Sequence, residues 1–395
     1  MSAEPFDAAV AQCYRQLVTN FPFLKAAFLQ ALADSGSVGP NTGWLPEHTI
    51  IEEGDQTLAF MPTYIKDHSW GEYVFDWAWA NAYQRNGLNY YPKLVSAIPF
   101  SPVTGPKVRF AEKANQQRTS RQLIDKVLSR ANELGASSWH LLFPDAQTLS
   151  NFSHPELMRR SGVQFHWFNR DYQCFDDFLA TFVSRKRKMV RKERRRIAEQ
   201  DIDIKTLEGA EIDHNLWAFF YRLYQNTYLK RSGGGGYLTP EFFVRLGETL
   251  AENLAMAVAT INGERIACAL YFHDGNTLYG RYWGCVREYE YLHFELCYYQ
   301  GIDYAIAHQL KKFDAGAQGE HKILRGFEPV ETHSLHWIKH PGFAEAIGRF
   351  IDQEQLDNSR YIAGVQSVLP YKQDIIANVH SEQPQHKLTG TANTE

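Results

Sequence analysis

The sequence predicts an α+β protein built from two tandem copies of one plan, each a mixed, mostly antiparallel sheet flanked by helices. Three observations support this prediction. Helical and strand patterns alternate along the first half, and a similar order returns in the second. The chain has 395 residues, which is too long for one ordinary core and fits two domains of common size. Two hairpin turns, Asn262-Gly263 and Asp274-Gly275, favour antiparallel strands.

The domain organisation follows from that repeat. We expect an N-terminal domain over residues 1–170, a basic connecting helix over 171–200 and a C-terminal domain over 201–374. The chain turns polar from about residue 375, so residues 375–395 are predicted to be a disordered tail.

The composition excludes several classes of protein. A content of 44% hydrophobic and 14% aromatic residues is enough to fill two cores. The net charge of −4, from 41 basic and 45 acidic residues, gives no global attraction to nucleic acid or membrane, so such a partner requires a local patch. The cysteines are odd in number and lack CxxC spacing, which argues against a disulfide framework and against a zinc site. They are Cys13, Cys174, Cys268, Cys285 and Cys297.

Targeting signals are not evident in the sequence. The first residues include an early acid and no apolar core segment, which argues against a signal peptide. No run of about 18 uncharged apolar residues is long enough to span a bilayer. We therefore expect a soluble, cytoplasmic protein that needs no metal.

The first half is predicted to alternate helices and strands. In order, we expect a helix over 21–33, two strands around the Gly54-Asp55 turn, a tryptophan-rich segment over 75–85, a strand over 92–100, a helix over about 117–134, a strand over 137–144, a short helix within 146–160 and a strand over 163–169. The aromatic residues of this half indicate either core packing or a surface that stacks on sugars or peptides. They are Trp70, Trp77, Trp79 and Tyr83.

The second half repeats the plan. We expect a strand over 201–207, a helix over 215–229, a second helix with Thr239 as N-cap and Pro240 at its first position, three strands joined by the two hairpin turns, a helix from about 291, strands at 313–317 and 334–338, and a long final helix. The glycine run Gly233 to Gly236 is either a lid or a permissive loop.

The joint between the halves is strongly basic. Residues 175–200 have a helical pattern, with Phe178, Phe182, Met189 and Ile197 on one side. Nine of the twelve residues from 185 to 196 are basic, and only Glu193 opposes them. This density indicates either a solvated helix face or a site for an anion, such as nucleotide phosphates, an RNA acceptor stem or an acidic membrane surface. The basic residues are Arg185, Lys186, Arg187, Lys188, Arg191, Lys192, Arg194, Arg195 and Arg196.

The segment over 291–329 is the most informative for function. Its helical part has apolar side chains spaced to share one buried face: Leu292, Leu296, Tyr299, Ile306 and Leu310. Its second part interleaves glycines with ionisable groups: Gly316, Gly319, Glu320, His321, Lys322, Arg325 and Gly326. Such a mixture lets backbone amides and charged side chains approach a ligand, although a solvated loop after a core helix has the same composition.

Three motifs resemble those of a known family. They are PFSPVTGP at 99–106, the run from WGC to LHFELCYYQ at 283–300, and the group GAQGEHK, RGF and THSLHW between 316 and 337. Together with the repeated plan and the basic helix, they resemble the tandem GNAT-fold (acyl-CoA N-acyltransferase-like) enzymes of the FemAB/FemX type. More closely, residues 22–354 are similar to a bacterial family of peptidoglycan biosynthesis/recognition proteins.

The resemblance implies transfer of an acyl or aminoacyl group to an amine. The implied donor is acyl-CoA or aminoacyl-tRNA, and the implied acceptor is a cell-wall precursor. In single-domain GNAT enzymes, a glycine-rich turn ahead of the central helix holds the donor pyrophosphate. This chain has no clean Q/RxxGxG/A motif at either corresponding place, where Gly105 lies between two prolines and Gly284 is the lone glycine.

Such a transfer needs a base for the amine proton and donors for the tetrahedral oxyanion. We expect His321 or Glu320 to be the base and Lys322 or Arg325 to offset negative charge. Glu295 is either a buried partner of a basic residue or a second acid/base group.

Other residues complete the predicted site. His321, His333 and His336 each have either a role in the site or a purely structural one. Cys297 is either a nucleophile or a small core residue. The predicted substrate-binding residues are Arg187, Arg191, Arg194, Arg195, Gly316, Gly319, Tyr299, His333 and His336.

The main prediction is a transferase with its cleft in or beside the second copy, and two hypotheses from other classes stay open. In the first, the protein is non-catalytic and binds a wall precursor or an RNA. In the second, the basic helix is an adaptor on an anionic membrane surface, with salt-sensitive binding.

Overall fold

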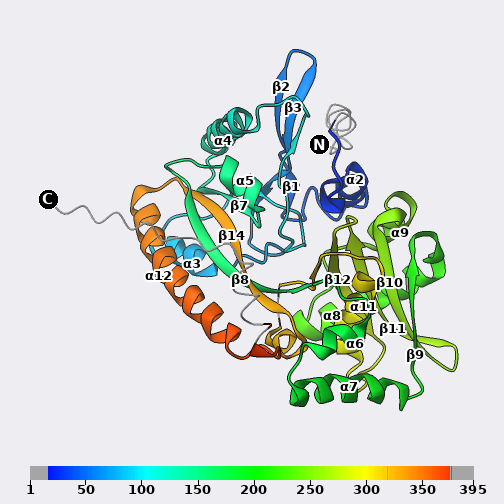
Figure 1. Cartoon of the computed structure of the whole chain (residues 1–395). Helices are drawn as coiled ribbons and strands as arrows, with labels where there is room; N and C mark the ends of the chain where they lie inside the picture. The colour runs from blue at the N-terminus through cyan, green and yellow to red at the C-terminus, as the bar shows by residue number, and fades with distance from the viewer. Residues whose placement is uncertain (1–16, 318, 374, 376–395) are drawn as a thin grey trace.

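The computed structural model describes residues 17–317, 319–373 and 375. The predicted tail beyond residue 375 and the amino-terminal segment with Cys13 lie outside the described residues. The first half contains η1 (Pro22–Leu24), α2 (Ala26–Asp34), β1 (Leu45–Pro46), β2 (Thr49–Glu53), β3 (Gln56–Met61), β4 (Thr63–Lys66), α3 (Trp77–Arg85), β5 (Lys93–Ser96), β6 (Arg109–Phe110), α4 (Gln116–Glu133), β7 (Ser138–Leu142), α5 (Ala146–Asn151) and β8 (Met158–Phe168) (Figure 1).

The second half begins with two helices. It contains α6 (Phe175–Ala180), α7 (Ser184–Ala198), β9 (Asp203–Glu208), η2 (Gly209–Glu211), α8 (His214–Ser232), α9 (Pro240–Thr249), η3 (Ala251–Asn253), β10 (Leu254–Ile261), β11 (Glu264–His273), β12 (Thr277–Cys285), α10 (Leu292–Phe294), the π-helix η4 (Glu295–Tyr299), α11 (Gln300–Ala307), β13 (Lys312–Asp314), η5 (Glu320–Arg325), β14 (Glu328–Ile338) and α12 (Pro341–Gln366). In the part of the chain that the structure describes, every helix is too short or too polar to span a bilayer.

One large sheet runs through the molecule. Its eleven strands follow the order β1-β4-β5-β7-β14-β8-β13-β12-β11-β10-β9, and a separate three-stranded sheet has the order β2-β3-β6. Among the described strands, only the pairs β5·β7 and β12·β13 are parallel. The predicted α+β class with mostly antiparallel sheets is therefore confirmed.

The same unit of strands and helices occurs in each half. In the first half, β4 and β5 are antiparallel, and the chain then passes through α4 to β7, which is parallel to β5. In the second, β11 and β12 are antiparallel, and the chain passes through α10, η4 and α11 to β13, which is parallel to β12. This repetition confirms the predicted tandem plan.

The two halves exchange their last strands. The final strand of the first half, β8, pairs with β13 of the second half. The final strand of the second half, β14, lies between β7 and β8 and pairs with both. The exchange joins both halves in one sheet, and the domain boundaries given above stay a prediction.

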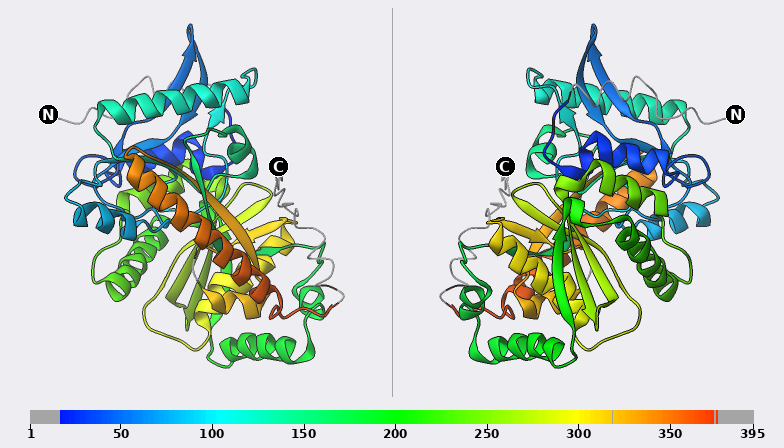
Figure 2. Two further views of the ribbon diagram at one scale, coloured as in Figure 1. Left: turned by 90° about the vertical axis from the view of Figure 1, so that its left-hand side faces the viewer. Right: turned by 90° about the vertical axis from the view of Figure 1, so that its right-hand side faces the viewer.

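Helices cover both faces of the second-half sheet (Figure 2). Successive residues of a strand point to opposite faces, so Met256 and Val258 pack with α8, α9 and α2, whereas Ala255 and Ala257 pack with η4, α11 and α7. The side chains predicted to share a buried face in 291–310 are buried in the second of these clusters.

Local sequence explains where these elements begin and end. The Thr239 side chain accepts a hydrogen bond from the Phe242 amide, and Pro240 is the first residue of α9, as predicted. The hairpin turns at Asn262-Gly263 and Asp274-Gly275 join β10 to β11 and β11 to β12. Asn262 and Gly263 have positive φ angles of 51° and 81°, which an Asn-Gly turn tolerates.

The basic segment departs from the prediction of one helix over 175–200, because it forms the separate helices α6 and α7. Between them, Val183 is extended (φ −61°, ψ 145°). Its amide donates to the carbonyl of Pro370 at 2.9 Å, so the segment around residue 370 stabilises the interruption between the two helices. A contact that remote in sequence is invisible to helical periodicity.

Candidate active site between the two halves

A pocket of about 520 Å³ opens where β12 and β13 diverge. These parallel strands pair only from Thr277 with Lys312 to Tyr279 with Asp314. Beyond that point β12 continues, while residues 315–317 and 319 line the opposite side. Both halves contribute to the pocket, with the loop over 69–77 and Phe100 from the first half and α8, β12 and the helix from 292 from the second.

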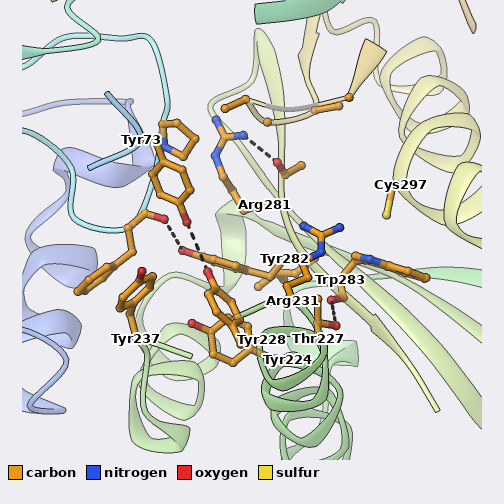
Figure 3. A pocket seen from close by; sticks show the side chains of 18 of the residues that line it. Tyr73, Tyr224, Thr227, Tyr228, Arg231, Tyr237, Arg281, Tyr282, Trp283 and Cys297 are labelled. Carbon is orange, nitrogen blue, oxygen red and sulfur yellow. Dashed lines mark hydrogen bonds between the residues drawn. The ribbon is translucent and has the colours of Figure 1, made fainter. Parts of the chain in front are cut away.

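Tyrosines form one wall of this pocket. Tyr224 and Tyr228 come from α8, Tyr282 from β12, and Tyr237 and Tyr73 from loops (Figure 3). The hydroxyls of Tyr73 and Tyr228 lie 3.4 Å apart. Burial raises the pKa of Tyr282 to about 12 and that of Tyr228 further. These hydroxyls therefore stay neutral and are able to donate hydrogen bonds to a ligand.

Two arginines at the pocket differ in their surroundings. Arg281 is buried and binds Asp314 with an Nη2–Oδ2 distance of 2.8 Å, so it ties β12 to β13 where their pairing ends. Arg231, near the end of α8, lines the pocket beside Trp283 (Figure 3). Within residues 17–317, 319–373 and 375, no carboxylate forms an ion pair with Arg231. Its positive charge is available to an anionic group of a ligand.

A histidine and a tyrosine meet at the rim of the pocket. The Tyr298 hydroxyl lies 2.7 Å from Nε2 of His321, and the ring of His293 lies 5.7 Å from that of His321. Partial burial, together with the positive charges of Arg325 and Lys322, lowers the pKa of His321. Its imidazole is therefore neutral near neutral pH and is able to accept a proton. Burial lowers the pKa of His293 to about 3.

The π-helix presents two side chains to the pocket. Cys297 and Tyr298 line it, whereas Leu296 and Tyr299 are buried in the core. The Leu296 carbonyl accepts a hydrogen bond from the Tyr271 hydroxyl, which gives a backbone acceptor of the wide turn a partner. Burial raises the pKa of the Cys297 thiol, so it is protonated and a poor nucleophile.

In the first half, the corresponding opening is filled by the chain itself. The last pair between β5 and β7 is Ser96 with Leu141, and beyond it Phe100 and Val103 are buried and Gly105 bridges Pro144. A Cβ on Gly105 would lie 2.5 Å from the ring of Phe21. This glycine allows close packing, and the pocket opens in the second half.

A protein-family model matches residues 5–373, nearly the whole chain, and describes a peptidoglycan biosynthesis/recognition family. The chain belongs to the FemAB-like family. The predicted resemblance of this FemAB-like protein to that family is thereby confirmed. No curated protein sequence matches it significantly.

Several solved structures resemble the FemAB-like chain at low sequence identity. One is the C-terminal domain of a putative lysylphosphatidylglycerol synthetase from Agrobacterium fabrum, with 10% identity, a TM-score of 0.49, and coverage of 86% of this chain and 93% of the other. L-PGS from Bacillus licheniformis has 12% identity, a TM-score of 0.48, and coverage of 82% of this chain and 96% of the other. FemX has the same identity and TM-score. For FemX, the coverage is 82% of this chain and 94% of that one.

The FemAB-like structure places three of the predicted site residues at the pocket. Gly316, Gly319 and His321 line it. Lys322 is buried beneath this segment, where its Nζ donates to the Gly316 carbonyl at 2.6 Å, and burial lowers its pKa to about 8. Lys322 therefore stabilises the backbone at Gly316 and does not line the pocket.

Arg325 lies behind His321. Its Nη2 is 2.6 Å from a carboxylate oxygen of Glu193, and its Nη1 donates to the carbonyl of His321 at 2.7 Å. The guanidinium also lies 3.4 Å from the centre of the Phe294 ring. Arg325 thus positions the histidine.

Three other predicted residues lie away from the pocket. Glu320 is exposed and accepts a hydrogen bond from Tyr361 at 2.6 Å. Glu295 is buried and accepts from Arg194 at 3.1 Å. The Tyr299 hydroxyl donates to Glu193 in the interior. These three side chains act within the protein's own packing.

The two remaining histidines of the prediction occupy different surroundings. His336 is fully buried, and its Nδ1 lies 2.6 Å from Nδ1 of His140. His333 lines a second pocket of about 230 Å³, with its Nε2 2.8 Å from Nη2 of Arg159. Tyr73, Phe75 and Ala317 line both pockets, so the two openings are neighbours.

The predicted arginines of α7 do not line either pocket. Arg194 points inward and binds Asp303 at 2.7 Å as well as Glu295. Arg191 and Arg195 are exposed, and Arg187 is half-buried. Among the described residues, no group of three or more His, Cys, Asp or Glu side chains is arranged to hold a metal ion.

Sequence reasoning missed the tyrosine wall and Arg231. A signal for them exists, since Tyr224, Tyr228 and Arg231 are spaced i, i+4 and i+7 on the helix predicted over 215–229 and just beyond it. Such spacing places all three on one face, next to the glycine run. The pattern alone did not show that this face borders a pocket.

Proposed function

We propose that this FemAB-like protein transfers an acyl or aminoacyl group to an amine in the tyrosine-walled pocket. The observation that carries the proposal is the His321–Tyr298 pair at the rim of a pocket that is also lined by Arg231, a cation with no ion pair to the residues that the structure describes. A volume of about 520 Å³ is within the usual range for small-molecule sites. Membership of a peptidoglycan biosynthesis/recognition family supports a wall precursor as the acceptor.

His321 acts as the general base in this proposal. The amine attacks the carbonyl carbon of the donor, so a C–N bond forms as the C–S or C–O bond to the leaving group breaks. The neutral imidazole takes the amine proton, directly or through the Tyr298 hydroxyl, and returns it to the departing thiolate or alkoxide. Proton transfer by a positioned side chain is typically worth about 10²- to 10⁴-fold in rate.

Arg231 and the tyrosine hydroxyls bind the substrate and the developing charge. Arg231 is placed to hold an anionic group, either a phosphate of the donor or a carboxylate of the acceptor. Tyr228 and Tyr282 carry neutral hydroxyls that are able to donate to a tetrahedral oxyanion. Their burial excludes water and strengthens these interactions.

Both donor classes remain within the proposal, because a thioester and a ribose ester present the same reacting carbonyl. The decisive experiment incubates the purified protein with acyl-CoA or with aminoacyl-tRNA, together with amine-bearing wall-precursor peptides, and identifies the product by mass. We expect a product whose mass equals acceptor plus acyl group. The His321→Ala variant should form it about 10²- to 10⁴-fold more slowly, whereas Lys113→Ala on the distant surface should not change its rate.

The same experiment tests the non-catalytic alternative. Tight binding of a precursor in the absence of any product, with every donor tried, would contradict the transferase proposal and favour a recognition protein. The pocket's aromatic wall suits either role, and turnover separates them.

A further inference from the structure

We propose that α7 and the neighbouring residues 367–372 form a docking face for the surface of a bilayer that contains acidic phospholipids. This face lies apart from the pocket. It is built from cations that form no ion pair with the described part of the chain, next to exposed apolar side chains. The proposal does not depend on the activity proposed above.

The structure divides the nine cations of α7 into two groups. Four have carboxylate partners within the protein: Arg191 with Asp176, Arg194 with Glu295 and Asp303, and Arg195 and Arg196 with Glu199. The other five form no ion pair with any residue in the described ranges: Arg185, Lys186, Arg187, Lys188 and Lys192. Like charges this close repel one another, so an external anion would stabilise the helix.

The unpaired charges are concentrated on the outward side of the helix. Val190, Glu193 and Ile197 are the buried side of α7. Arg185, Lys188 and Lys192 are exposed and spaced i, i+3 and i+7, so they share one outward stripe about 10 Å long at 1.5 Å per residue. Figure 2 shows α7 as an outer helix along one edge of the molecule. The stripe is therefore exposed on an outer helix of the molecule.

Apolar side chains adjoin the start of α7. Val183 is 41% exposed and Val368 is 54% exposed. Backbone hydrogen bonds hold their segments together, from the Val183 amide to the Pro370 carbonyl at 2.9 Å and from the Lys372 amide to the Thr181 carbonyl at 2.8 Å. Lys372 is exposed beside them and adds a further cation.

This combination favours a bilayer over a nucleic acid. An acidic membrane attracts the cations, and its interfacial region also accepts exposed valines. An RNA backbone would use the cations but would give the valines no apolar environment. The inward side of α7 is already packed, so the helix would adhere to the surface and not insert its length.

The test measures binding of the full-length protein to sedimented vesicles. Vesicles of pure phosphatidylcholine are compared with vesicles of equimolar phosphatidylcholine and phosphatidylglycerol, at low and at high salt. We expect binding to the acidic vesicles only, weakened by salt. The triple variant Arg185→Gln, Lys188→Gln, Lys192→Gln should bind these vesicles at least about tenfold more weakly, since each basic residue near an acidic surface contributes to attraction.

A matched control removes the same charge elsewhere. Lys113, Arg118 and Arg121 are exposed without ion pairs among the described residues, at or near the start of α4. Figure 1 places α4 at the opposite end of the molecule from α7. The triple variant Lys113→Gln, Arg118→Gln, Arg121→Gln should bind acidic vesicles like the unmodified protein.

A second variant tests the apolar part and guards against a folding defect. The double variant Val183→Ser, Val368→Ser keeps every charge, and we expect it to lose several-fold in vesicle binding and to keep any binding to a transfer-RNA mixture. The proposal is overturned if acidic and neutral vesicles bind equally, if both charge variants lose binding equally, or if the α7 variant loses RNA binding with vesicle binding unchanged. The last result would make α7 an RNA site.

Discussion

Arg325 and Glu193 form a buried ion pair, with Nη2 of the arginine 2.6 Å from Oε1 of the glutamate. The pair joins the basic helix α7 to the short helix η5, and η5 also carries His321 at the pocket rim. Glu193 is the one acid within the basic run, and its role is internal. The Arg325–Glu193 ion pair therefore links α7 directly to the segment that carries the proposed base, His321.

Removal of Glu193 should destabilise the protein strongly. In Glu193→Ala the Arg325 guanidinium stays buried without its carboxylate, which typically costs about 3–5 kcal/mol. The free energy of unfolding from urea titration measures this. Replacement of both partners, Glu193→Leu with Arg325→Met, should recover most of the loss, because no charge is then left buried. A double variant as unstable as the single one would contradict this account.

The activity of His321 should depend on pH in one direction. Its pKa is lowered by burial and by neighbouring cations, so the imidazole is neutral at neutral pH. The rate should fall as the pH drops through that lowered pKa, because protonation removes the base. His321→Ala should reduce kcat by about 10²- to 10⁴-fold and remove this limb of the pH profile. Tyr298→Phe should lower kcat less and leave the limb in place. An unchanged profile in His321→Ala would exclude it as the base.

The buried pair His140–His336 should make folding sensitive to acid. Burial lowers both pKa values well below the ordinary value, so both rings are neutral in the folded protein. Unfolded histidine takes up a proton below about pH 6.5, and the unfolded state then binds more protons. The free energy of unfolding should therefore fall as the pH decreases from about 6.5. His336→Gln should show a shallower decline over this range, and an equal slope would contradict the assignment.

Arg231 should act on binding and not on chemistry. If its charge holds an anionic group of the substrate, Arg231→Ala should raise KM by about 10- to 100-fold with little change in kcat. This factor corresponds to the loss of one hydrogen bond to a charged group. Lys230→Ala is the matched control, since Lys230 is the neighbouring exposed cation of α8 and does not line the pocket. Equal effects of the two variants would assign the loss to general charge.

Within the glycine run, Gly236 should be sensitive to an added side chain and Gly235 should tolerate one. A Cβ on Gly236 would lie 2.1 Å from the ring of Tyr224, whereas one on Gly235 would meet nothing within 4 Å. Gly236→Ala should displace Tyr224 and cost about 1–3 kcal/mol of stability, as overpacking does. Gly235→Ala should be neutral in a thermal melt. Similar melting temperatures for both variants would show that the tyrosine wall is free to shift.

The sequence was sufficient for features that depend on neighbours along the chain. The hairpin turns, the Thr239 cap, the alternation of helices and strands and the tandem plan all follow from local backbone preferences and hydrophobic period, and the structure has them. The motifs that resemble the FemAB-like family are likewise short runs of neighbouring residues, so the sequence alone was sufficient to detect them. The predicted concentration of charge on α7 is also a property of sequence alone.

Only the tertiary structure decided which charged groups face the pocket. Arg325 and Glu193 are 132 residues apart, and Tyr73 meets Tyr228 across 155 residues. No periodicity reveals such partners. The physical reason is that burial of an unpaired charge costs much free energy, so a buried charged side chain pairs with an opposite charge that the fold places beside it, however distant in sequence. Arg325 is consequently turned inward to Glu193, and Arg231, which has no described carboxylate partner, is left facing the pocket.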